Sequence, residues 1–106
     1  MVDLKDFEGK IEEMTSFYKS LPGRVNDKTD MFYAILARDS AEKIEELVVK
    51  YHNSPKNTYL HSLHGHVMTL ARGVENFKDR AIDKEHDEFG KLQYQLLTFL
   101  EERVKW

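Results

Sequence analysis

The sequence predicts an all-α fold, an antiparallel up-down-up-down four-helix bundle that forms a single domain over residues 1–106. Apolar residues recur every three or four positions along most of the chain, which is the period of a helix, and no stretch alternates as a strand does. Two prolines and five glycines stand among 106 residues, of which 33% are charged and 41% hydrophobic. This balance is typical of long amphipathic helices joined by short loops.

The first helix is expected from about Leu4 to Leu21. Asp3 is a suitable N-cap, and the sequence LPGR at 21–24 ends the helix. The apolar positions that define its inner face are Leu4, Phe7, Ile11, Met14, Tyr18 and Leu21.

The second helix is expected from Asn26 or Asp27 to about His52, and its apolar positions leave two alternatives open. The two apolar sets are Met31, Phe32, Ile35 and Leu36, then Ile44, Leu47, Val48 and Tyr51. At about 100° per residue, the second set is rotated by more than a third of a turn from the first. Asp39 stands at capping-box spacing from Glu42, so the helix is either kinked or broken near Asp39, or continuous with different neighbours along its length.

The third helix is expected to begin at Ser54 and Pro55 and to run to about Ala81, and the fourth to follow a short link near AIDKE at 81–85. The inner positions of the third helix are Leu60, Leu63, Val67, Leu70, Val74, Phe77 and Ala81. Those of the fourth are Phe89, Leu92, Leu96, Phe99 and Leu100.

Three of the five histidines stand in YLHSLHGHVM at 59–68, on the predicted third helix. Helical rotation puts His61 and His64 on one side and His66 on the opposite edge, so the three do not converge. A metal site would need His61 and His64 together with a ligand from another helix. A His-metal-binding bundle therefore stays an alternative function, while our primary interpretation assigns no metal and no other cofactor.

Arg80 and His86 are separated by five residues, where the third predicted helix gives way to the fourth. This spacing is similar to the Arg-x4-6-His motif of the HEPN family, all-helical domains that include metal-independent ribonucleases acting as dimers. The resemblance implies that Arg80 stabilises charge on the scissile phosphate and that His86 transfers a proton. Ala81 follows the arginine where that family usually has a polar residue.

Composition excludes several other classes. Without cysteine there is no disulfide, no Cys-ligated zinc and no thiol nucleophile, which fits a cytoplasmic protein. A net charge of −3, with basic residues interleaved among acids, predicts no nucleic-acid partner. The beginning of the chain carries charges from its third residue, and no window is apolar enough for a membrane span, so we expect a soluble protein with no membrane partner.

The fourth helix suggests a partner surface, because its apolar arc is wider than one face requires. The residues that widen it, or lie beyond it, are Tyr94, Leu97, Leu100, Val104 and Trp106. A helix buried at the centre of the bundle also explains such an arc. We expect a non-enzymatic interaction or assembly module with no catalytic residues, which self-associates as a homodimer or docks a protein partner through this face.

Overall fold

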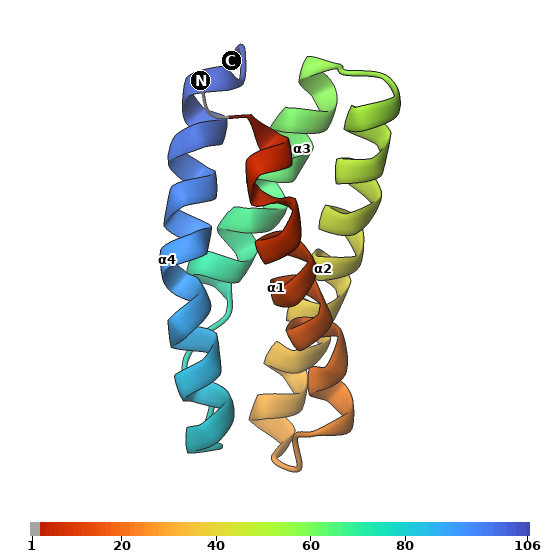
Figure 1. Ribbon diagram of the computed structural model, residues 1–106. Helices are drawn as coiled ribbons and strands as arrows, with labels where there is room; N and C mark the ends of the chain where they lie inside the picture. The colour runs from red at the N-terminus through yellow and green to blue at the C-terminus, as the bar shows by residue number, and fades with distance from the viewer. Residues whose placement is uncertain (1–2) are drawn as a thin grey trace.

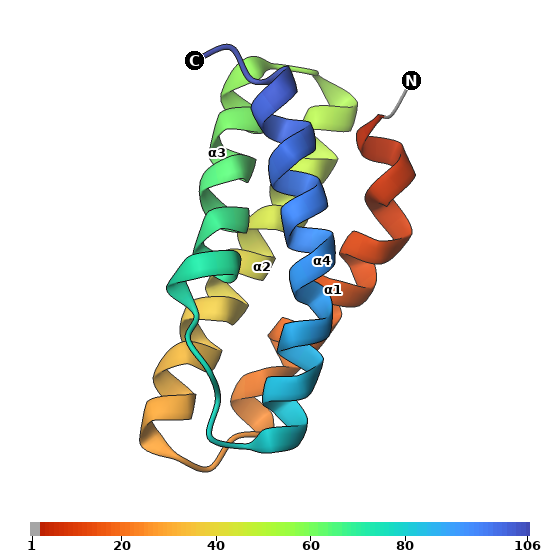
Figure 2. The same cartoon turned by 90° about the vertical axis from the view of Figure 1, so that its left-hand side faces the viewer.

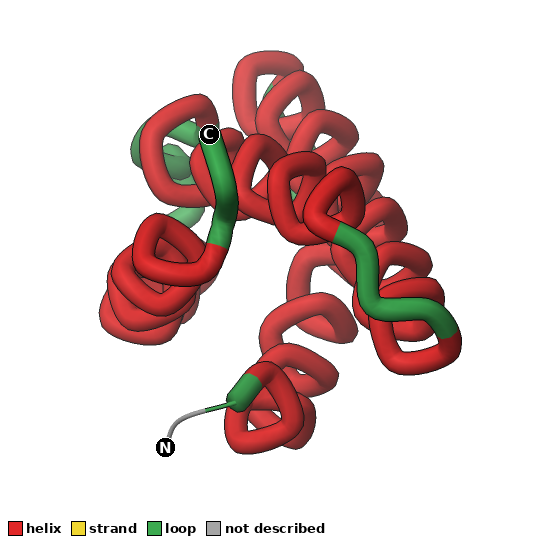
Figure 3. The backbone as a smooth tube through the Cα atoms, turned by 90° about the horizontal axis from the view of Figure 1, so that it is seen from above, coloured by secondary structure: helices red, strands yellow, loops and turns green. Residues whose placement is uncertain are grey.

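The computed structural model describes residues 3–106, and in them four α-helices run alternately up and down (Figure 1). These are α1 (Glu8–Ser20), α2 (Lys28–Asn53), α3 (Asn57–Met68) and α4 (Arg80–Arg103). The view from above shows helices joined by loops, and no strand occurs in this part of the chain (Figure 3). The predicted all-α four-helix bundle is confirmed.

Each helix packs against the next one along the chain, and aromatic side chains connect α1 with α4. The ring centroids of Phe7 and Phe99 are 5.5 Å apart, and those of Phe17 and Phe89 are 5.2 Å apart. Large flat side chains therefore fill the space between the first and last helices. No helix in residues 3–106 is both long and apolar enough to cross a bilayer.

The start of α1 follows the sequence prediction. Asp3 and Asp6 form a reciprocal capping box, which opens a 3-10 turn at Leu4–Phe7 that leads directly into α1. The predicted inner positions of this helix are buried, with Phe7 partly so. A second short turn at Leu21–Gly23 ends the element where LPGR was expected to end it.

Helix α2 is continuous from Lys28 to Asn53, so the kink or break near Asp39 does not occur. Asp27 caps the helix by accepting the backbone N–H groups of Thr29 and Asp30. The Asp39 carboxylate caps nothing and is bound by the Arg38 guanidinium instead. One inner face runs along most of the helix, and its buried apolar residues are Ala34, Ala37, Ala41, Ile44, Leu47 and Val48. Because these residues stay on one side of the helix, a continuous α2 can keep its inner face toward the core without a kink or break.

The third helix is shorter than predicted. Helix α3 begins at Asn57 and ends at Met68, and a single π-helical turn follows at Thr69–Gly73. Residues 74–79 then continue in the direction of α3 to the end of the bundle where α4 begins (Figure 2). Val74 and Phe77 are buried as expected, although neither is helical. The expected link at 81–85 is the first turn of α4, capped by Asp79, and Ala81 is exposed.

Two carboxylates hold this connection in place. Asp30 on α2 is only 2% exposed, and its two oxygens accept the backbone N–H groups of Lys78 and Asp79 at 2.8 and 3.1 Å. Asp83 on α4 accepts the N–H of Phe77 at 2.9 Å. Backbone groups that helix α3 would have paired are thus satisfied by side chains, which allows the chain to leave the helix while Val74 and Phe77 stay buried.

Candidate functional site

Three of the five residues of the partner surface predicted on the fourth helix are buried. Leu97, Leu100 and Val104 are 4%, 0% and 6% exposed, because α4 buries its wide apolar arc against the rest of the bundle. Tyr94 and Trp106 are exposed, but they lie in different surroundings. Trp106 meets the rings of His61 and His64, both on α3, whereas Tyr94 borders a groove between α4 and the turn before α1.

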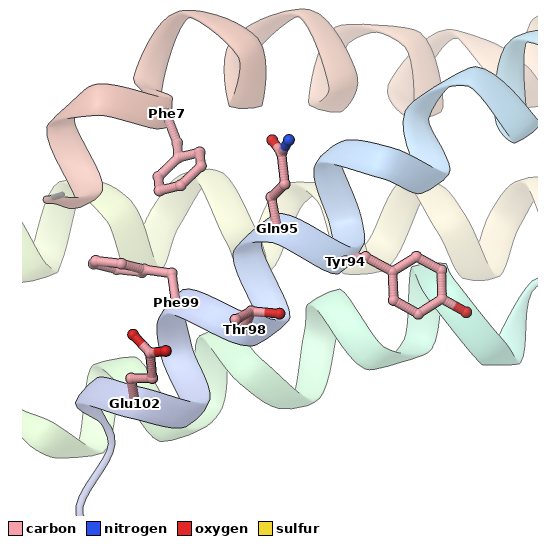
Figure 4. Close-up of a pocket in the computed structure, with 6 residues that line it drawn as sticks. All are labelled: Phe7, Tyr94, Gln95, Thr98, Phe99 and Glu102. Carbon is pink, nitrogen blue, oxygen red and sulfur yellow. The ribbon is translucent and has the colours of Figure 1, made fainter.

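That groove has a volume of about 410 Å³ and is open to solvent (Figure 4). Phe7 reaches it from the turn before α1, and α4 supplies Tyr94, Gln95, Thr98, Phe99 and Glu102. Glu102 is the one carboxylate among these lining residues, and no imidazole accompanies it. The groove therefore offers mainly apolar contact, and its lining holds no second carboxylate or imidazole to act with Glu102.

The largest group of exposed apolar side chains on one helix lies instead on the first half of α2. Phe32 is 65% exposed, Ile35 is 39% exposed, and Leu36 beside them is partly exposed. We call these three residues the α2 stripe. They point outward because the small side chains of Ala34 and Ala37 occupy the inner face, where both are 0% exposed.

In the sequence, the residues of the α2 stripe belong to one of the two apolar sets of this helix, but the structure leaves them exposed or partly exposed. Phe32 and Ile35 are far more apolar than alanine, so they dominate any reading of hydrophobic period. The signal that gives the true rotation is the run of alanines at 34, 37 and 41, which continues in phase into Ile44 and Val48. The small alanines and the large residues that follow them lie on one side of the helix, and this shared side is the inner face.

The histidines of α3 lie as their helical rotation predicts. His61 is exposed, His64 lies 3.3 Å from a carboxylate oxygen of Glu101, and His66 lies near Lys43 on the other side. Burial lowers the pKa of His66, and the positive charge of Lys43 lowers it further. Within residues 3–106, no three His, Asp or Glu side chains come together as a metal ion would require.

His86, the histidine of the HEPN-like spacing, is engaged inside the bundle. Its Nδ1 lies 2.7 Å from the Tyr18 hydroxyl, and its Nε2 lies 3.3 Å from the Val74 carbonyl oxygen. Burial lowers the pKa of His86, against smaller raising effects of the Val74 hydrogen bond and of Asp83 and Asp87. Both ring nitrogens of His86 are therefore hydrogen-bonded within the chain.

Comparison with known proteins transfers no function to this chain. No family model, no curated protein and no solved structure matches it. A function for this chain is therefore inferred from the geometry of the α2 stripe and its surroundings.

Proposed function

We propose that this chain is a cytoplasmic, non-enzymatic interaction module, a small helical bundle that binds a protein chain through the α2 stripe. The observation that carries the proposal is the 65% exposure of Phe32 beside the exposed Ile35 and the partly exposed Leu36. Single exposed apolar residues are ordinary on a protein surface, whereas contiguous ones rimmed by charge are typical of an interface.

The surroundings of the α2 stripe support this function. Lys28 precedes the stripe, Asp39 and Lys43 follow it, and all three are exposed. An apolar centre with a charged rim is the usual anatomy of a protein–protein contact. Helix α2 is also the longest element described and is fixed along its inner face, so the stripe is presented on a rigid support.

The test is site-specific photocrosslinking in the native cells. Benzoyl-phenylalanine replaces Phe32 in one variant and Val49 in a control variant. Val49 is a matched control because it lies on the same helix and is 59% exposed, close to the 65% of Phe32.

We expect a discrete crosslinked product from position 32 and none from position 49. The product supports the proposal whether its mass corresponds to two copies of the chain or to one copy and another protein. No product from position 32, or equal products from both positions, would contradict it.

A further inference from the structure

We infer that the occupant of the α2 stripe is a second copy of this chain, paired antiparallel along α2 about a two-fold axis. This inference rests on the proposed function and names its partner. It depends on a symmetry in the pattern of exposed residues on α2, which is visible only once the rotation of the helix is known.

Apart from the sign of the charges, the exposed residues on the outward face of α2 have the same spacing and the same order of charged and apolar types in both directions along the helix. Lys28, Phe32, Ile35 and Asp39 are all exposed, and they are separated by four, three and four residues. A two-fold axis at the level of the 33–34 peptide therefore brings Phe32 of each copy against Ile35 of the other. The same rotation brings Lys28 of each copy against Asp39 of the other.

The neighbouring side chains obey the same symmetry. Met31 and Leu36 flank the central pair on opposite sides, both are partly exposed, and they are equally distant from the 33–34 peptide. The rotation places Met31 of each copy beside Leu36 of the other. Such a contact is isologous, because one surface patch is its own complement.

The charges select the antiparallel orientation. In a parallel pair, Lys28 would face Lys28 and Asp39 would face Asp39, and like charges repel. In the antiparallel pair, each end of the apolar centre is closed by two opposite charges. Polar ends around an apolar centre also exclude the register shifts that a purely apolar stripe would allow.

Both charged residues are available for this pairing. Lys28 is the first residue of α2, where the helix dipole is unfavourable for a cation, and no side chain in residues 3–106 pairs with it. Arg38 contacts Asp39 only at Oδ1, and the Asp39 side chain remains 60% exposed. A carboxylate from a second copy would therefore give Lys28 the counter-charge that its own chain does not supply.

The size of the contact sets the expected strength. It spans residues 28–39, about 18 Å of helix, and so buries less than the roughly 800 Å² per partner of a standard interface. We expect a reversible dimer with a dissociation constant on the order of 10 micromolar or weaker.

Sedimentation velocity on the purified chain, with charge-reversed variants, tests the pairing. Lys28→Glu alone makes both ends of the dimer acidic, and Asp39→Lys alone makes both ends basic. We expect each variant to dimerise at least about tenfold more weakly than the wild-type chain. An equal mixture of the two variants places opposite charges at both ends again, so we expect it to dimerise about as well as the wild-type chain.

Two controls separate this arrangement from general effects of charge. Phe32→Glu should abolish the dimer, whereas Val49→Glu, at an exposed site on the same helix, should leave it unchanged. Lys84→Glu changes the net charge as Lys28→Glu does, at an exposed site on α4, and should also have no effect.

The outcomes distinguish this inference from the proposed function. A wild-type chain that stays monomeric at about 1 mM overturns the inference, as does a dimer that survives Phe32→Glu or a mixture that does not recover. If position 32 then crosslinks to a different protein in the cell, the interaction module stands without the second copy. If position 32 crosslinks to nothing, both proposals fail.

Discussion

The Tyr18 hydroxyl lies 2.7 Å from Nδ1 of His86 in the interior of the bundle, between α1 and α4. Gln93 donates to the same hydroxyl from its Nε2, also at 2.7 Å. The Gln93 amide NH₂ can only donate, so the Tyr18 hydroxyl accepts from it and donates its own hydrogen bond to Nδ1 of His86. Nε2–H of His86 then donates to the Val74 carbonyl, so the network requires a neutral imidazole.

This network predicts that the bundle loses stability as the pH falls below about 6.5. Burial lowers the pKa of His86 in the folded chain below the value of about 6.5 that it has when unfolded. Between these two pKa values the unfolded chain binds more protons, so the free energy of unfolding decreases with falling pH over that window. Urea unfolding followed by circular dichroism at several values between pH 7.5 and 5 measures the effect.

The control for this pH dependence is His86→Leu, because carboxylates and other histidines also titrate. The stability advantage of the wild-type chain over His86→Leu should shrink as the pH falls, and a constant or growing advantage would contradict the assignment.

Tyr18→Phe should lower the free energy of unfolding by about 1–3 kcal/mol at pH 7.5, since it leaves Nδ1 of His86 and the Gln93 amide without their partner.

Asp30→Asn is predicted to destabilise the bundle by about 1–3 kcal/mol through the connection before α4. Both oxygens of Asp30 accept backbone N–H groups. In the asparagine variant, the side-chain NH₂ would face one of these N–H groups, so two donors would meet without an acceptor. The amides of Lys78 and Asp79 should also exchange with deuterium faster than in the wild-type chain. Asp39→Asn, on the exposed face of α2, should leave both the stability and these exchange rates unchanged.

The sequence was sufficient to predict elements whose signals are local. The capping box at Asp3 and the LPGR turn bound α1 as predicted. The inner positions of the third predicted helix from Leu60 to Phe77 are all buried. These predictions hold because a cap, a turn and a period of three to four residues each act within a few positions of the chain.

The end of α3 could not be predicted in the same way. Val74 and Phe77 keep the helical spacing of three, yet they are buried from an irregular connection. What holds that connection is Asp30, which lies 48 residues before Lys78 in the chain, and no local pattern reveals such a pairing. The sequence also left open whether Leu97 and Val104 face a partner or the core, because their burial depends on how neighbouring helices pack.

Two glycines inside helices are predicted to be sites where alanine stabilises the bundle. Gly65 lies within α3 and Gly90 within α4, and a Cβ atom added at either position would meet no atom within 4 Å. Gly65→Ala and Gly90→Ala should each raise the free energy of unfolding by up to about 1 kcal/mol. Gly73→Ala serves as a comparison outside the α-helices, and it should gain less.

The rotation of α2 about its axis can be tested by mutation, and both proposals for the α2 stripe depend on this rotation. Ala37 is 0% exposed on the inner face, so Ala37→Leu should overpack the core and destabilise the bundle by about 1–3 kcal/mol. Phe32 is 65% exposed, so Phe32→Ser should change the stability of the monomer by no more than about 0.5 kcal/mol.

Hydrophobicity alone predicts the opposite order, in which losing a phenylalanine costs most and enlarging an alanine costs little. Thermal and urea unfolding of both variants, at protein concentrations low enough to exclude association, separate the two orders. A large loss for Phe32→Ser with none for Ala37→Leu would show that Phe32 belongs to the core. The face offered to a second copy would then not exist.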